Sequence, residues 1–288
     1  MQQARSIEHH DSGGHPSLSD AASIPSLLHP EAAEMAAVEL ERFLTLMESL
    51  APVDWDQPTA CPLWNVRQVV AHVIGAAASY ARWSQFKRQT SPVVQRPYRK
   101  VGFSLLDALN QIQVDDRRAA TPVDLLAELR DVGPRAIATR KRLPAIVRAV
   151  RLPLPLLGLV PLGYLTDLIY TRDMWMHRLD ICRATGREMV QTPPHDGRIT
   201  ALVVRDLTRK LTPKLAGQAV VYELTGLSGG GFHLGENASP IARITMDALD
   251  FHLQASGRLK ADELSSHASC SGDEHMARLA LDNTQVPY

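Results

Sequence analysis

Two aspartates and a histidine recur at helical spacing, as Asp173, His177 and Asp180 in Leu-Ile-Tyr-Thr-Arg-Asp-Met-Trp-Met-His-Arg-Leu-Asp-Ile. Residues three and four positions apart share one face of a helix, so the three side chains are expected to lie together. The same face carries the apolar residues Leu165, Ile169 and Met176. It is therefore expected to face inward, where carboxylates and an imidazole are costly to bury without compensation. A bound cation would compensate them, because Asp173 and His177 place an oxygen and a nitrogen ligand one turn apart.

His72 is the natural candidate for a third ligand, in the segment Val-Val-Ala-His-Val-Ile-Gly. Taken alone, a histidine beside an apolar helix face is more often a core or boundary residue with a hydrogen-bond partner. Together with Asp173 and His177 it gives two histidines and one carboxylate, a ligand set that suits zinc or iron(II) with one position open. Spacing does not show whether His72 meets the other two, because it lies far from them in the sequence.

Asp180 has three possible roles. It can orient a ligand histidine as an outer carboxylate, act as a general base for a bound water or thiol, or form a salt bridge with Arg178 or Arg183. Cys61 is a possible nucleophile, but no histidine stands near it in the sequence, so an inert thiol is expected.

The composition indicates a globular chain. Of its 288 residues 45% are hydrophobic and 22% are charged, which is enough for one large domain or two ordinary ones. Lys plus Arg (31) equals Asp plus Glu (31), so no overall attraction to nucleic acid or acidic membranes is expected. The three cysteines are an odd number at irregular spacing, which favours reduced thiols. With no apolar signal segment at the start, we expect a cytoplasmic protein.

The helical pattern is clearest in the first two thirds of the chain. Residues 1–28 are polar and without a period, and we expect a disordered tail there. Four long helices are predicted: from Pro30 to Leu50, from Val66 towards Trp83, from Pro122 to residue 141, and from about Leu165 to Arg183. Asn65 with Gln68 forms a capping box before the second of them. Four long helices joined by long loops predict an antiparallel bundle over residues 29–190.

The segment 152–165 is strongly apolar and contains three prolines. It is too short to span a bilayer, and prolines interrupt any helix, so we predict a loop. Beyond Pro193-Pro194 the pattern changes to short alternating strands, with Asp247 and Asp273 as caps of two further helices. Residues 198–288 are therefore predicted to form a small α+β domain, in which His252 and His275 are structural or exposed.

Two motifs resemble those of a known family. Cys-Pro-Leu-Trp-Asn-Val-Arg-Gln-Val-Val-Ala-His-Val-Ile-Gly resembles the opening motif of the mycothiol-dependent maleylpyruvate isomerase family, and Arg-Asp-Met-Trp-Met-His-Arg-Leu-Asp-Ile resembles its second metal motif. Two C-terminal segments, around Ile-Thr-Met-Asp and Gly-Asp-Glu-His-Met-Ala, are similar to its sterol-carrier-like domain. The resemblance spans roughly residues 30–285. It implies a DinB-like four-helix bundle, of the DinB/YfiT-like metalloenzyme superfamily, followed by a sterol-carrier-like α+β domain.

The resemblance also implies a chemistry. His72, Asp173 and His177 would bind a divalent metal, usually zinc, and mycothiol, the small thiol of actinobacteria, would be the cosubstrate. The chain departs from the family at Asp173, where the best-understood members have Glu, which is longer by one methylene. A metal-bound thiol is held as thiolate at neutral pH. The thiolate can then attack a small electrophile, which leads to isomerisation of that molecule, to conjugation or to thiol transfer. Asp180 and Arg258 are the expected catalytic residues, with Arg258 as a cation for an anionic substrate or an ordinary helix terminus.

Two other functions stay open at this stage. The first is a non-catalytic protein that binds an apolar ligand, with the loop 152–165 bordering its pocket. The second is a metal-dependent hydrolase that uses activated water, which would turn over without any thiol. The partners expected in every case are small molecules, with no nucleic acid and no membrane.

Overall fold

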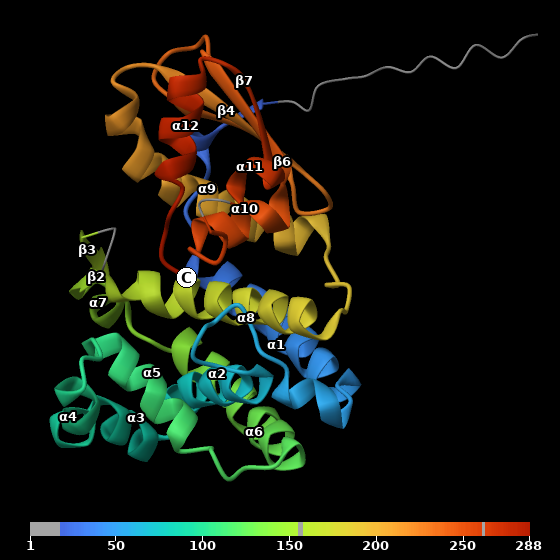
Figure 1. The fold of residues 1–288 in the computed structure, drawn as a ribbon. Coiled ribbons are helices and arrows are strands. Elements are labelled where there is room, and N and C mark those ends of the chain that lie inside the picture. The colour runs from blue at the N-terminus through green and yellow to red at the C-terminus, as the bar shows by residue number, and fades with distance from the viewer. Residues whose placement is uncertain (1–17, 155–157, 261–262) are drawn as a thin grey trace, which may run out of the picture.

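A helical half and a half built on a β-sheet follow one another along the chain (Figure 1). The computed structural model describes residues 18–154, 158–260 and 263–288. Helix α8 lies between the two halves, and the sheet half stands above it in Figure 1. Within the described ranges, no helix is both long and apolar enough to cross a membrane.

Four long helices form the core of the helical half: α1 (His29–Ser49), α2 (Val66–Ala81), α6 (Pro122–Lys141) and α8 (Tyr170–Thr185). Each of α1 and α2 contacts both α6 and α8. Their shared core contains large apolar side chains, among them Leu40, Phe43, Val70, Ile74, Leu125 and Leu129. All four helices were predicted from the apolar period. The last begins differently, because residues Tyr164–Ile169 form a π-helical turn that leads into α8.

Local signals set two ends of these helices, and the cap at Asn65 is the one predicted. The Asn65 side chain accepts from the Gln68 backbone N–H at 3.0 Å, and the Gln68 side chain accepts from the Asn65 N–H at 3.0 Å. Gly186 ends α8 in the left-handed region at φ 66°, which costs glycine little because it has no Cβ.

Three shorter helices between α2 and α6 were not predicted: α3 (Trp83–Thr90), α4 (Pro92–Lys100) and α5 (Leu105–Asp115). Helix α5 packs closely on α2 at Gly75, where an added Cβ would lie 2.4 Å from the Cβ of Gln113. Helices α3 and α4 consist mainly of polar and charged residues, so they offer few apolar residues from which a helix could be predicted. The three helices are positioned by contact with α2 and with each other.

The proline-rich segment was predicted as a loop and forms a hairpin instead. After α7 (Ala145–Arg148), strand β2 (Arg151–Leu154) pairs antiparallel with β3 (Gly158–Pro161). Residues 155–157 lie outside the described residues.

The second half is built on a five-stranded mixed sheet in the order β1-β5-β4-β6-β7. Its strands are β1 (Leu18–Asp20), β4 (Ala219–Thr225), β5 (Gly230–Gly235), β6 (Ala242–Asp247) and β7 (Ala268–Gly272). Strand β1 pairs parallel with β5. The N-terminal segment was predicted as a tail up to residue 28, but residues 18–20 add a strand to this sheet, and a 3-10 turn follows at Ala21–Ser23. Residues 1–17 lie outside the described part of the chain.

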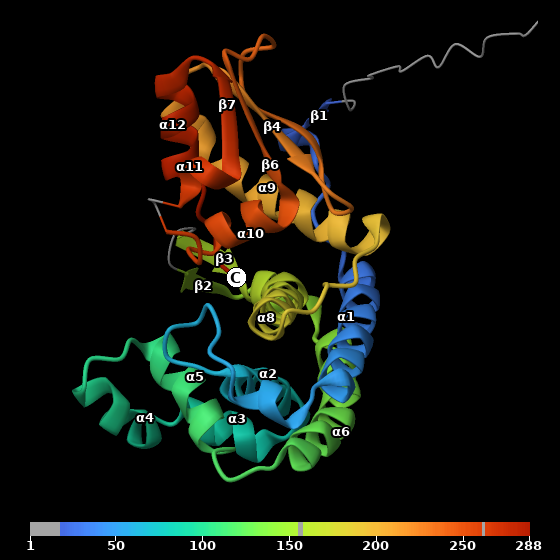
Figure 2. The same ribbon diagram turned by 45° about the vertical axis from the view of Figure 1, so that its right-hand side comes forward.

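Burial alternates along β6, so one face of the sheet is covered while the other is more open. The sheet contacts α9 (Arg198–Leu211), α10 (Ala248–Ala255) and α12 (Glu274–Asp282), and the short helix α11 (Leu264–His267) precedes β7 (Figure 2). The predicted caps are present, because Asp247 accepts from the Leu249 N–H at 2.8 Å and Asp273 from the Met276 N–H at 2.9 Å.

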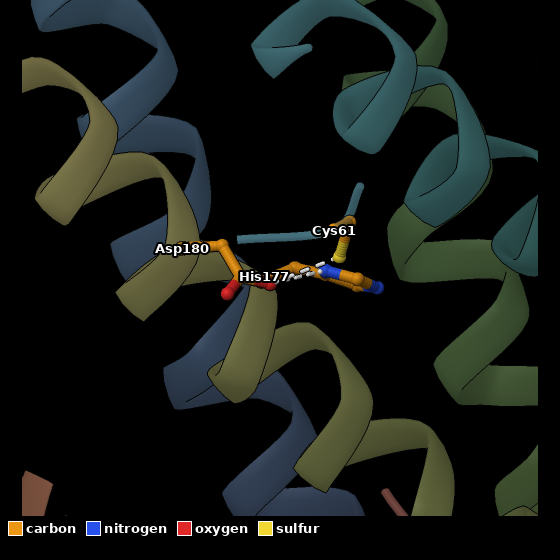
Figure 3. A group of neighbouring side chains, drawn as sticks. All are labelled: Cys61, His177 and Asp180. Carbon is orange, nitrogen blue, oxygen red and sulfur yellow. Dashed lines mark hydrogen bonds and ion pairs between the residues drawn. The ribbon is translucent and has the colours of Figure 1, made fainter. Parts of the chain in front are cut away.

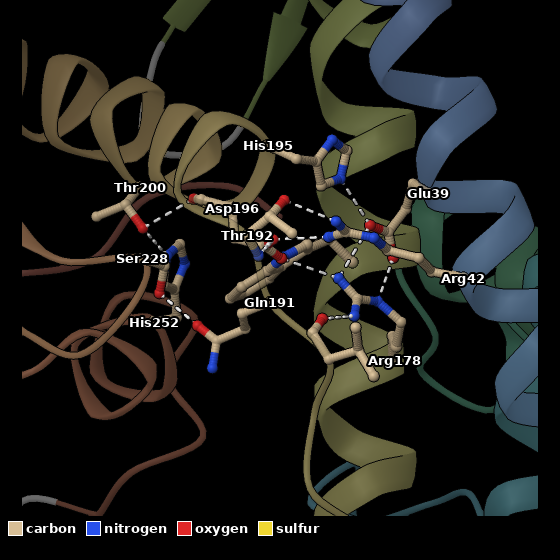
Figure 4. Close-up of polar contacts among 12 residues, drawn as sticks. Glu39, Arg42, Arg178, Gln191, Thr192, His195, Asp196, Thr200, Ser228 and His252 are labelled. Carbon is tan, nitrogen blue, oxygen red and sulfur yellow. Dashed lines mark hydrogen bonds and ion pairs between the residues drawn. The ribbon is translucent and has the colours of Figure 1, made fainter.

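A buried polar network joins α8 to α1 and to the connection between the two halves (Figure 4). The Arg178 guanidinium donates to Glu39 Oε1 at 2.7 Å and to Asp196 Oδ1 at 3.0 Å. Arg42 donates to Asp196 Oδ2 at 2.6 Å, and His195 Nε2 lies 2.9 Å from Glu39 Oε2. Glu39 and Asp196 are fully buried. The network therefore fixes α8, which carries Asp173, His177 and Asp180, against both neighbours.

Candidate functional site

Helices α2 and α8 bring His72, Asp173 and His177 together. Asp173 Oδ2 lies 3.3 Å from His72 Nε2, and Asp173 Oδ1 lies 3.4 Å from His177 Nε2. One nitrogen or oxygen atom from each of the three residues lies within 4.8 Å of the others. Both histidines are buried, while the Asp173 side chain keeps 27% of its surface exposed. The carboxylate thus stands between two imidazole nitrogens at an opening of the fold.

The charges of this cluster depend on one another. Burial raises the pKa of Asp173, but the adjacent His177 and His72 outweigh it and leave this pKa below its usual range. Burial lowers the pKa of His177, but the carboxylates of Asp173 and Asp180 reverse this effect and raise it well above its usual value. This raised pKa favours the protonated form of His177, which lies between the carboxylates of Asp173 and Asp180.

The donor set fits a divalent metal. His177 Nδ1 lies 2.9 Å from Asp180 Oδ2, so a carboxylate holds one ring nitrogen and leaves Nε2 directed at Asp173. A ligand histidine usually has such a carboxylate or carbonyl on its second nitrogen. His72 Nδ1 is buried without a hydrogen-bond partner among the described residues, and its ring packs against Trp64 with centroids 4.9 Å apart. Two imidazole nitrogens with one carboxylate suit zinc or iron(II).

Asp180 is paired across the two halves of the molecule. Arg258, which follows α10, donates from Nε to Asp180 Oδ1 at 2.7 Å and from Nη2 to Asp180 Oδ2 at 2.8 Å. This partner differs from Arg178 and Arg183, which the sequence offered, because Arg178 pairs with Glu39 and Asp196. Burial raises the pKa of Asp180, but His177 and Arg258 outweigh it and keep this pKa below its usual range.

Cys61 lies beside Asp180 and His177 (Figure 3). Its Sγ is 3.6 Å from Asp180 Oδ2 and 3.5 Å from Arg258 Nη2. Cys61, His177 and Asp180 form a second group whose ligand atoms lie within 4.8 Å of one another. The sequence does not reveal these contacts, because Asp180, His177 and Arg258 all lie far from Cys61 along the chain. The signal that could have pointed to a role for this thiol is its place at the start of the family-like motif, in Cys61-Pro62.

A cavity of about 420 Å³ reaches the cluster at His72 and Asp173. Its other walls come from α2, α3, α5, the π-helical turn before α8 and the C-terminal segment. Its lining residues include Phe86, Gln89, Leu106, Leu109, Gln113, Leu165, Ile169, Tyr170 and Tyr288. Leu165, Ile169 and Met176 were predicted to face inward. Leu165 and Ile169 line this cavity, and Met176 is buried in a separate hydrophobic core. Of the described part of segment 152–165, Leu165 reaches this cavity, and the β2–β3 hairpin does not border it.

His252, the C-terminal histidine predicted to be structural, is buried between Thr200 and Tyr288. Its Nε2 lies 2.9 Å from Thr200 Oγ1, and its Nδ1 lies 2.6 Å from the Tyr288 hydroxyl. Burial lowers the pKa of His252 to about 3, so the ring is neutral at neutral pH. His252 therefore holds the Tyr288 wall of the cavity in place.

Comparison with known proteins identifies similar sequences and folds. A family model described as the mycothiol maleylpyruvate isomerase N-terminal domain matches residues 36–182. A crystal structure of the mycothiol-dependent maleylpyruvate isomerase is 14% identical with a TM-score of 0.55, over 89% of this chain and 97% of that one. A histidine-to-alanine mutant of that isomerase is 13% identical with a TM-score of 0.54, over the same shares. At these identities the likeness shows the fold alone. No curated protein matches the chain.

Proposed function

The chain belongs to the mycothiol maleylpyruvate isomerase family, and from that premise we propose a metal-dependent, thiol-using enzyme that acts on a small electrophile. The observation that carries the proposal is the meeting of His72, Asp173 and His177 at the wall of a cavity. We further propose mycothiol as the thiol, and isomerisation, conjugation or thiol transfer as the reaction class.

His72, Asp173 and His177 would hold the metal, most simply zinc. When bound, the metal would supply the positive charge that keeps a thiol deprotonated at neutral pH. Asp173 is shorter than Glu, but it already lies within 3.4 Å of a nitrogen of each histidine, which supports its role as a ligand in this chain.

The cavity would hold the electrophile beside the thiol. A thiolate that adds to an electrophilic double bond allows rotation about that bond and can then leave again, which isomerises the substrate. If the thiol stays attached and the neighbouring carbon takes up a proton, the result is conjugation. Holding both reactants in one pocket favours either reaction by proximity and orientation.

We propose that α1, α2, α6 and α8 form a DinB-like four-helix bundle within residues 29–190. The contacts of α1 and α2 with both α6 and α8 support it. We propose that residues 198–288 are a sterol-carrier-like α+β domain, which the five-stranded sheet and its helices support. In the structure β1 extends this domain with residues 18–20 from the other end of the chain.

Asp180 and Arg258 would support the metal site without binding the metal. Asp180 would be a positioning residue, because it accepts from His177 Nδ1 and fixes the ring that presents Nε2. Arg258 would hold Asp180 with two hydrogen bonds, and its guanidinium also lies next to the Cys61 thiol.

Replacing Asp180 with Asn should weaken zinc binding by about 10–100-fold, because His177 loses the carboxylate that orients it. Arg258→Met should have a smaller effect in the same direction, since it leaves Asp180 in contact with His177. Metal competition against a chelator measures both variants. Unchanged zinc affinity in Asp180→Asn would contradict the positioning role.

Mycothiol should bind the zinc-loaded protein and should bind the metal-depleted protein at least about tenfold more weakly. The reason is that a thiol gains most of its affinity when it ionises on a metal. Titration calorimetry at millimolar ligand measures this, and S-methylated mycothiol is the matched control because it cannot ionise. Equal binding of both compounds would contradict the thiol proposal. Hydrolytic turnover without any thiol would point instead to a hydrolase.

A further inference from the structure

We propose that the electrophile held in the cavity beside His72 and Asp173 is an uncharged, largely apolar molecule and not a dicarboxylate. The proposal rests on the proposed function for what happens to this molecule. Maleylpyruvate, which gives the family its name, carries two carboxylates at neutral pH. The walls of this cavity suit a different chemical class.

The cavity is lined mainly by hydrocarbon. Phe86 from α3, Leu106 and Leu109 from α5, and Leu165 and Ile169 before α8 all contribute to its walls. Phe86 is 41% exposed and Leu106 is 56% exposed, so apolar side chains also stand at the accessible part of the wall. Apolar groups exposed beside a cavity are stabilised when an apolar ligand covers them.

The polar groups in the walls are mostly neutral. Gln113 and Gln89 line the cavity, and the Gln113 Nε2 donates to Gln89 Oε1 at 2.9 Å. The Tyr170 hydroxyl donates to the backbone carbonyl of Ala76. Among the described lining residues the carboxylate is Asp173, the titratable imidazole is His72, and there is no lysine or arginine.

The arginines nearby do not line the cavity, and two of them, Arg258 and Arg172, are paired with carboxylates. Arg258 donates two hydrogen bonds to Asp180. Arg172 is fully buried and donates to Asp206 Oδ2 at 2.8 Å. Arg140 lies with its Cζ 4.8 Å from the centre of the Tyr170 ring and donates to the Thr166 carbonyl at 3.0 Å. A dicarboxylate in this cavity would lose its hydration, and the described wall offers no lysine or arginine to a carboxylate that does not reach the metal, which disfavours it.

The test compares an uncharged ligand with a dianion on the zinc-loaded full chain. The probes are 4-phenylbutan-2-one, an uncharged ketone that carries a phenyl group, and maleate, and titration calorimetry measures both affinities. We expect the ketone to bind at least about tenfold more tightly than maleate. Maleate binding as tightly as the ketone, or no binding of the ketone, would overturn the proposal.

Two neighbouring leucines of α5 supply matched variants. Leu106 lines the cavity, whereas Leu105 is 61% exposed and is not part of its wall. Leu106→Arg should weaken ketone binding about tenfold, within the range for a lost contact in an apolar pocket, and should strengthen maleate binding. Leu105→Arg should leave both affinities unchanged. Equal effects of the two variants would show that the cavity does not select the ligand.

The outcome also separates this proposal from the proposed function. Ketone selectivity that survives while mycothiol fails to bind would contradict the thiol-using enzyme and keep the ligand class. Mycothiol binding together with a preference for maleate would keep the enzyme and overturn the ligand class.

Discussion

Asp173→Ala should abolish stoichiometric zinc binding, and with it any thiol-dependent turnover. The carboxylate lies between the two imidazoles, 3.3 Å from His72 Nε2 and 3.4 Å from His177 Nε2, and its removal leaves two nitrogen ligands. The loss should exceed the ~10–100-fold that follows from removing a supporting partner of a ligand. Elemental analysis of purified protein after dialysis against zinc measures it, and His177→Ala should behave in the same way.

Two controls make this result specific. Asp282→Ala removes an exposed carboxylate of α12 that pairs with Arg278, and it should leave the zinc content unchanged. Asp173→Glu keeps a carboxylate that is longer by one methylene, and it should retain zinc. Equal zinc in the unaltered protein, Asp173→Ala and His177→Ala would remove the metal site from the proposed function.

Arg178→Met should destabilise the protein by about 3–5 kcal/mol, which is the usual cost of breaking a buried ion pair. Arg178 is 2% exposed and donates to Glu39 and Asp196, which are both fully buried. Methionine fills much of the same volume but leaves the two carboxylates without this cation. The free energy of unfolding from urea titration measures the change.

Arg130→Met is the matched control for Arg178→Met. Arg130 is 56% exposed and pairs with Glu48 on the surface, so its replacement should change the free energy of unfolding by about 0–1 kcal/mol. A similar loss in both variants would mean that the network between α1, α8 and the connection to the second half contributes no special stability.

The local signals of the sequence predicted the parts of the fold that neighbouring residues decide. Asn65, Asp247 and Asp273 cap helices where the sequence placed them, because a cap needs only the two or three residues that follow. The helical pairing of Asp173 with His177 is of the same kind. The hairpin of β2 and β3 was missed because its prolines favour a loop, although its two strands are close in the sequence. Strand β1 was missed because its partner β5 lies far along the chain, where no local pattern relates the two segments.

The sequence by itself determined the candidate ligands, the four long helices and the family resemblance, since residue type, spacing and capping are properties of short segments. Only the tertiary structure decided which side chains meet. It placed His72 from α2 against Asp173, and it gave Asp180 a partner in Arg258 from the second half instead of the adjacent Arg178. It also formed the apolar cavity at their side. The physical reason is that contacts between distant segments follow from how whole helices and the sheet bury their apolar faces, and spacing along the chain does not encode that packing.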